Sequence, residues 1–81
     1  MKFDVTITIS LKEGMLDPEA RAIQHALANL GFGAERLSTA RLFSITLDAA
    51  DEQAAYAEAE RMCERLLANP VIHRYTIEVM R

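Results

Sequence analysis

The side chains that most often carry chemistry are few in this sequence. Its only cysteine is Cys63, and its two histidines are His25 and His73. Neither histidine has a second ligand at the spacings typical of zinc sites, such as Cys-x-x-Cys or His-x-x-x-His. Cys63 follows Met62 on an apolar helix face, where cysteine ordinarily packs as a small hydrophobic residue. We therefore expect no metal site and no nucleophilic thiol.

Glycines and acidic residues offer no clearer active site. The segment Gly31-Phe32-Gly33 follows a predicted helix, whereas phosphate-binding glycines precede one, so these glycines are better explained as a helix stop and a turn. The acidic residues around 48–64 are spread around a second predicted helix, which is typical of a solvated face. We expect no catalytic or cofactor-binding residue on this chain.

Length and charge narrow the classes of protein. The 81 residues suffice for one domain, 1–81, with a thin core that self-association or a partner would supplement. The net charge of −3 disfavours nucleic-acid binding. A single cysteine fits a reducing compartment. Neither a signal peptide nor an apolar run of the roughly 20 residues that span a bilayer is evident, so we expect a cytoplasmic protein with no membrane contact.

The strands follow from alternation of apolar and polar residues. Residues 2–12 alternate cleanly, with Phe3, Val5, Ile7 and Ile9 on one face, and residues 71–80 alternate in the same way. Residues 35–48 also alternate but are long for one strand. This stretch is either one long bent strand or two strands that change direction near residues 38–41.

The helices follow from caps and periodicity. Asp17 is a good N-cap, Pro18 suits the first helical position, and Gly31 marks the end of an amphipathic helix. A second helix begins after Asp48 or Asp51 and runs to about residue 68, before Asn69-Pro70. The order predicts an α+β fold of the ferredoxin-like βαββαβ type, an antiparallel sheet with both helices on one face.

Arg41 interrupts the apolar side of the middle strand, between Thr39 and Phe43. A bulge or an edge position would account for it without any function. The alternative is a basic residue at a subunit contact or an anion site.

Two segments have a distinctive combination of residues. One is Leu16-Asp17-Pro18-Glu19-Ala20 after Gly14, continued by Leu30-Gly31-Phe32. The other runs from Met62-Cys63 through Leu66-Leu67-Ala68-Asn69-Pro70-Val71-Ile72 to Tyr75 and Ile77-Glu78. With these segments the whole chain resembles the PurS family, the small subunit of phosphoribosylformylglycinamidine synthase. The chain departs from the family's usual pattern at three places: it has Ala40-Arg41 in place of Gly-Lys, Glu19-Ala20 in place of Gln-Gly, and His73 in place of an acidic residue.

The resemblance implies a non-catalytic subunit that bridges a PurL-type synthetase and a PurQ-type glutaminase and supports ammonia transfer between them. ATP, magnesium and glutamine would be used by those partners, with no cofactor on this chain, and the chain itself would form a dimer or tetramer. Asp17, Pro18, Arg41, Asn69, Pro70 and His73 are the candidate subunit-contact residues, although capping and turn roles alone would account for Asp17, Pro18, Asn69 and Pro70.

Two other functions share the expected fold. An ACT-like regulatory module would bind a small molecule near a glycine turn such as Gly14. An acylphosphatase-like enzyme would need an arginine in the loop after the first strand, and residues 12–17 contain none.

Overall fold

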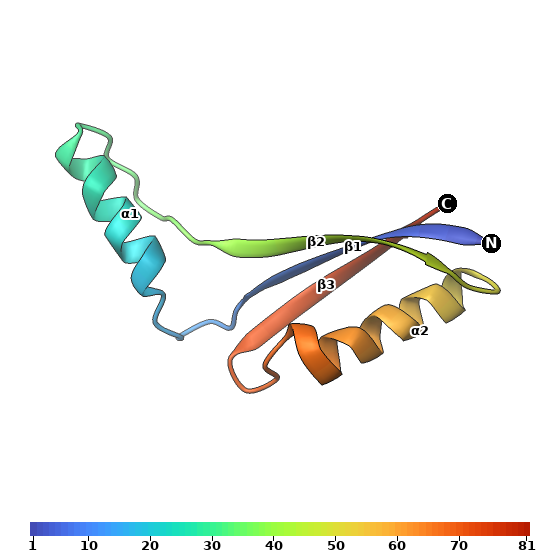
Figure 1. Cartoon of the computed structure of the whole chain (residues 1–81). Helices are drawn as coiled ribbons and strands as arrows, with labels where there is room; N and C mark the ends of the chain where they lie inside the picture. Colours follow the sequence, from blue (N-terminus) through green and yellow to red (C-terminus); the bar gives the residue numbers. More distant parts are fainter.

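The computed structural model describes all residues, 1–81, as a βαβαβ chain (Figure 1). Its elements are β1 (Lys2–Leu11), α1 (Pro18–Asn29), β2 (Ala40–Asp48), α2 (Glu52–Met62) and β3 (His73–Met80). A π-helical turn, Cys63–Leu67, continues α2. No helix combines the length and apolarity that crossing a membrane requires.

The sheet has three antiparallel strands in the order β2-β1-β3, so β1 is the central strand. Its alternating residues point one apolar set toward α2, and all four of these side chains are buried: Phe3, Val5, Ile7 and Ile9. The expected strand 2–12 is therefore confirmed, and it supplies most of the core.

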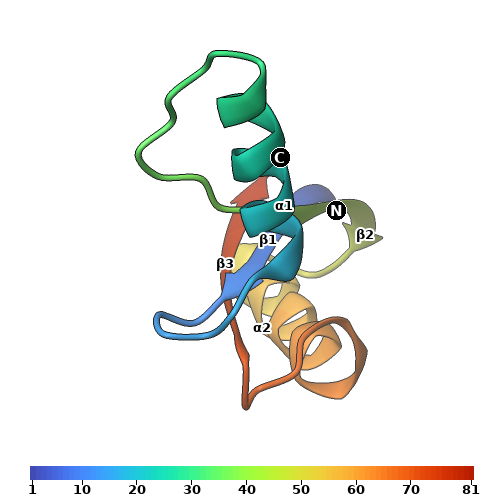
Figure 2. The ribbon, with the colours of Figure 1, turned by 90° about the vertical axis from the view of Figure 1, so that its left-hand side faces the viewer.

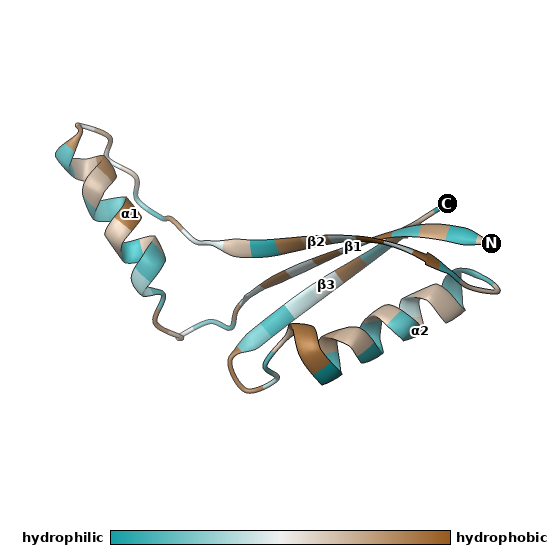
Figure 3. Cartoon of the chain, in the orientation of Figure 1, coloured by the Kyte–Doolittle hydropathy of each residue, from teal (hydrophilic) through white to brown (hydrophobic).

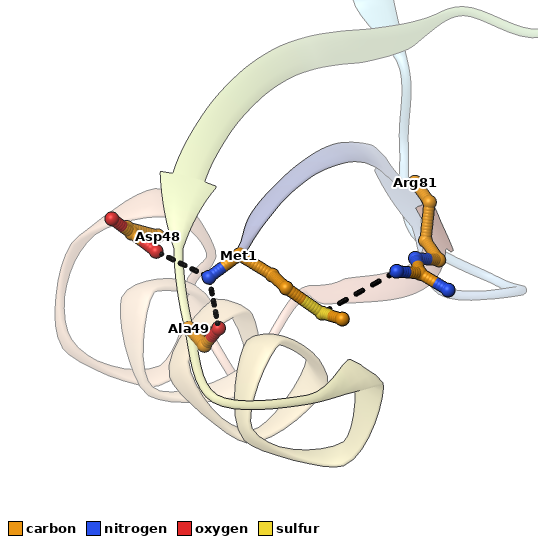
Figure 4. A network of polar contacts seen from close by, with 4 residues as sticks. All are labelled: Met1, Asp48, Ala49 and Arg81. Carbon is orange, nitrogen blue, oxygen red and sulfur yellow. Dashed lines mark hydrogen bonds and ion pairs between the residues drawn. The ribbon is translucent and has the colours of Figure 1, made fainter.

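Helix α2 covers the apolar face of this sheet. Asp51 caps it through a 2.8 Å hydrogen bond from the Ala54 amide to Oδ1. Ala55 and Ala59 are fully buried, since their small side chains let the helix approach β1 closely. Asp48, the other predicted cap, instead pairs at 2.9 Å with the Met1 amine (Figure 4).

The same corner joins both ends of the chain. The Met1 amine also donates to the Ala49 carbonyl at 3.1 Å, and the Arg81 guanidinium lies 3.6 Å from the Met1 sulfur (Figure 4). These contacts attach the start of β1 to the turn between β2 and α2.

Helix α1 stands away from the sheet as an arm (Figures 1 and 2). Gly31, with φ of +98°, turns the chain back after it, as the sequence predicted. Only Ala20 of this helix is buried. The α+β class with an antiparallel sheet and two helices is confirmed, but α2 alone covers the sheet face, because the loops on either side of α1 carry it beyond the end of β1.

The middle segment forms one strand, the first of the two predicted possibilities. Residues 40–48 pair continuously with β1, whereas residues 35–39 have no strand beside them. The order is therefore βαβαβ, without the fourth strand of the ferredoxin-like layout. The missing strand and the displaced helix make the chain elongated: its Cα radius of gyration is 16.1 Å, against about 12 Å for a compact domain of this length.

Candidate subunit-contact site

A hollow of about 290 Å³ lies where the arm joins the sheet. The end of β1, the start of β2, the first turn of α1 and the start of β3 all contribute to its lining. Three of the six predicted contact residues line it together, namely Asp17, Arg41 and His73. Tertiary structure thus gathers residues that are far apart in the sequence.

Asp17 fastens the arm at this hollow. Its Oδ1 accepts the Ala20 amide at 3.0 Å, and its Oδ2 accepts the Thr39 hydroxyl at 2.8 Å. The bond from the Ala20 amide, followed by that from Thr39, favours the carboxylate and lowers the pKa of Asp17. Pro18 is the first helical residue beside it. The capping role is as predicted, while the link to Thr39 had no signal in the sequence.

Arg41 occupies an inward-facing position without any bulge. The pairing of β1 with β2 is continuous, with Arg41 opposite Ile9, so the bulge interpretation is wrong. The edge interpretation fits, because β2 is an edge strand. The guanidinium lies 5.4 Å from the centroid of the Phe43 ring and forms no ion pair. Its charge is therefore available to a carboxylate from another molecule.

The segment from Asn69 to His73 forms a compact turn into β3. The Asn69 side chain accepts the Val71 amide at 2.9 Å, and its carbonyl accepts the His73 amide at 2.8 Å. The Asn69 amide donates to Nδ1 of His73 at 2.9 Å. Lys12 donates to the Pro70 carbonyl at 2.7 Å. Asn69 and Pro70 thus shape the turn that places His73 in the hollow.

The hollow brings together groups for binding but no nucleophile beside a base. Cys63 lies at the start of the π-helical turn and is buried in the core, where burial first and then the charges of Glu60 and Glu64 raise the pKa of its thiol. No group of three or more His, Cys, Asp or Glu side chains could hold a metal ion. Charge and hydrogen bonding at a surface hollow are suited to contact with another protein.

The lining also includes residues that the sequence did not mark as contact candidates. Glu19 in the first turn of α1 and Thr39 before β2 both face the hollow. In the sequence, Glu19 stands out only within the family motif, and Thr39 only as a polar neighbour of Arg41. Neither pattern could show that the two segments meet.

The chain is thus a small α+β domain with a helical arm that stands away from its sheet and a polar hollow where the two meet. The PurS family model, described as phosphoribosylformylglycinamidine (FGAM) synthase, matches residues 4–81. The chain belongs to the PurS family of FGAM synthase subunits.

Relatives support this over nearly the full length. The PurS subunit of phosphoribosylformylglycinamidine synthase from Methanothermobacter thermautotrophicus is 47% identical over 79 residues, which cover 98% of this chain and 94% of the relative. The crystal structure of Methanocaldococcus jannaschii PurS, one of the subunits of formylglycinamide ribonucleotide amidotransferase, is 42% identical with a TM-score of 0.89, covering 98% of this chain and 96% of that one.

A third similarity concerns the fold alone. A chain in the structure of PurLQS from Thermotoga maritima is 23% identical, with a TM-score of 0.90 and coverage of 99% of both chains. The ACT-like alternative is not favoured by any of these relatives.

Proposed function

We propose that this chain is the non-catalytic bridging subunit of phosphoribosylformylglycinamidine synthase, joining a PurL-type synthetase to a PurQ-type glutaminase. The observation that carries the proposal is the 47% identity, over 98% of this chain, to a subunit of that synthase. The arrangement of the chain supports it, because the arm and the hollow offer surfaces that the chain itself does not use.

The chemistry of the reaction explains why a bridging subunit is useful. Ammonia released from glutamine at one active site must reach an ATP-dependent site on another subunit before it is lost to water. A small subunit that contacts both would hold the two sites in register. ATP, magnesium and glutamine then belong to the partner subunits, and this chain contributes contacts in the cytoplasm, as a homodimer or tetramer.

Reconstitution tests the bridging role. Purified synthetase and glutaminase are mixed with ATP, magnesium and glutamine, with and without this chain, and both product formation and co-elution are followed. We expect omission to abolish the glutamine-dependent rate while synthesis driven by added ammonium salt persists. Full glutamine-dependent synthesis without this chain, together with no co-elution, would overturn the proposal.

Charge reversal tests whether the hollow is a contact site. Arg41→Glu replaces an exposed, unpaired cation at the hollow, whereas Arg61→Glu makes the same change on the exposed side of α2. We expect Arg41→Glu to weaken assembly with the partner subunits by about tenfold or more, since charge reversal at an interface costs over 1 kcal/mol. If both variants assemble with the partner subunits equally well, the hollow is not part of the interface.

A further inference from the structure

A second hollow lies on the arm itself, between α1 and the segment that returns from it to β2 (Figure 2). Its volume is about 300 Å³. We call it the arm groove, and six residues line it: Arg21, Gln24, His25, Ala28, Gly33 and Ala34. Arg21 and His25 are one helical turn apart, so their side chains leave the same face of α1. Figure 3 shows hydrophilic positions recurring along this helix. The arm thus has a polar groove to which no residue of the sheet contributes.

A side-chain hydrogen bond fixes the shape of the arm groove. The Gln24 side-chain amide donates to the Ala34 carbonyl at 2.7 Å, which ties α1 to the returning segment across ten positions of sequence. Both residues are half-buried. Gly31, with φ of +98°, reverses the chain between them. The groove is therefore a formed feature of the arm.

Several hydrogen-bond donors of the groove residues have no partner within the chain. The only ion pair joins Met1 to Asp48, so the Arg21 guanidinium forms none. The backbone amides of Gly33 and Ala34 donate to no carbonyl of the chain. Such amides need a partner, which water supplies in the isolated chain and a ligand can replace. The groove residues therefore bring together a guanidinium, an imidazole and two free backbone N–H groups.

The charge of the groove differs from that of its surroundings. No acidic side chain lines it, although the chain has 12 acidic residues against 9 lysines and arginines. In the hollow where the arm joins the sheet, Asp17 and Glu19 accompany Arg41. On the outer side of α2, Glu58 accompanies Arg61. The arm groove is therefore suited to an anionic group from outside the chain.

The exposure of the groove favours a protein segment over a small molecule. Arg21, His25 and Gly33 are exposed, whereas small-molecule sites bury most of the surface of their ligand. A carboxylate matches the guanidinium, which can donate two parallel hydrogen bonds to it. An Asp or Glu side chain on the surface of another protein brings such a group to an open groove.

We propose that the arm groove docks an acidic segment of a partner subunit, with a carboxylate of that segment bound by Arg21 and by the amides of Gly33 and Ala34. The His25 ring N–H is a further donor beside them. This inference rests on the proposed function, because the partner subunits of the synthase supply the segment. It adds a surface on the arm that is separate from the hollow lined by Arg41.

Binding measurements with charge-reversed variants test the docking. Association of this chain with the purified synthetase, with the purified glutaminase and with their mixture is measured by biolayer interferometry, with ATP, magnesium and glutamine present. Arg36→Glu, in the returning segment but outside the groove lining, is the matched control for Arg21→Glu. We expect Arg21→Glu to raise at least one dissociation constant by about tenfold or more, since it places like charges opposite each other, and Arg36→Glu to leave all of them unchanged.

The outcomes separate this inference from the bridging role. Equal dissociation constants for the two variants, with wild-type protein still binding its partners, would overturn the docking and leave the bridging role standing. Wild-type protein that binds neither partner nor their mixture would overturn both.

Hydrogen exchange followed by mass spectrometry locates the contact. The amides of Gly33 and Ala34 have no partner in the free chain, so they should exchange rapidly there and slowly in the complex with the partner subunits. We expect this slowing in residues 31–36 of the wild-type chain and its loss in Arg21→Glu at saturating partner concentration. Exchange of residues 31–36 that is the same in the free chain and in the wild-type complex would contradict the docking.

Discussion

Truncation of Ile7 to alanine should come close to unfolding the chain. Ile7 is fully buried at the middle of the central strand, between Phe43 of β2 and Ile77 of β3. It also belongs to the cluster that joins β1 to Ala59 and Cys63. With only a few residues in this core, no neighbouring layer is available to collapse into the space.

The magnitude follows from the atoms removed. Three carbon atoms leave the core, which costs about 2.4 kcal/mol at roughly 0.8 kcal/mol each. The cavity left behind adds about 2 kcal/mol at ~24 cal/mol per Å³. The total of about 4 kcal/mol compares with a free energy of unfolding of about 4–12 kcal/mol for a domain of this length.

Urea denaturation followed by circular dichroism measures this cost. Protein concentration must be held constant, because association contributes to apparent stability. Thr8→Ala, one residue along on the open face of the sheet, is the control and should cost less than about 1 kcal/mol. The interpretation of the core is refuted if Ile7→Ala loses no more free energy of unfolding than Thr8→Ala does.

Three further predictions concern single side chains. In Asp17→Asn, the difference in unfolding free energy from wild type should be largest at neutral pH and should shrink as pH falls below the ordinary carboxyl pKa of 3.8. The reason is that a lowered pKa stabilises the fold only while the carboxylate is charged. Urea midpoints at pH 7 and pH 3 measure the difference, and a value that does not change with pH would contradict the role of the charge. Ala59→Leu should lower the free energy of unfolding by about 1–3 kcal/mol, since the larger side chain overpacks the fully buried contact of α2 with β1. The control, Arg61→Leu at an exposed position, should change it by less than about 0.5 kcal/mol. Equal effects of the two substitutions would count against close packing of α2 on β1. The buried thiol of Cys63 should react slowly with a maleimide in the native protein and rapidly in denaturing urea, because burial raises its pKa and blocks access; prompt labelling of native protein would show that the site is open.

Local patterns predicted the elements well. The alternation of Phe3, Val5 and Ile7 depends only on the geometry of a strand, so β1 was predictable before any partner strand was known. Capping by Asp17 and termination at Gly31 depend on hydrogen bonds and backbone conformation within a few residues. The choice between Asp48 and Asp51 was open, because either could precede the helix.

The candidate site was predictable only in part. Asp17, Arg41 and His73 were singled out separately, for a cap, an interrupted pattern and a position after Asn-Pro. That they line one hollow depends on where the arm leaves the sheet. The hydrogen bond from Thr39 to Asp17 joins residues 22 positions apart, so a local sequence pattern cannot predict it.

The sequence by itself determined the first and last strands, the two helices, the α+β class and the family, because alternation, caps and motif residues are local properties of the chain. Only the tertiary structure decided that α1 leaves the sheet and that residues 35–39 stay unpaired. An amphipathic stripe has the same pattern whether its core lies in the same chain or in another molecule. Which surface such a stripe packs against depends on residues far away in the sequence, so only the tertiary structure shows that α1 does not cover its own sheet.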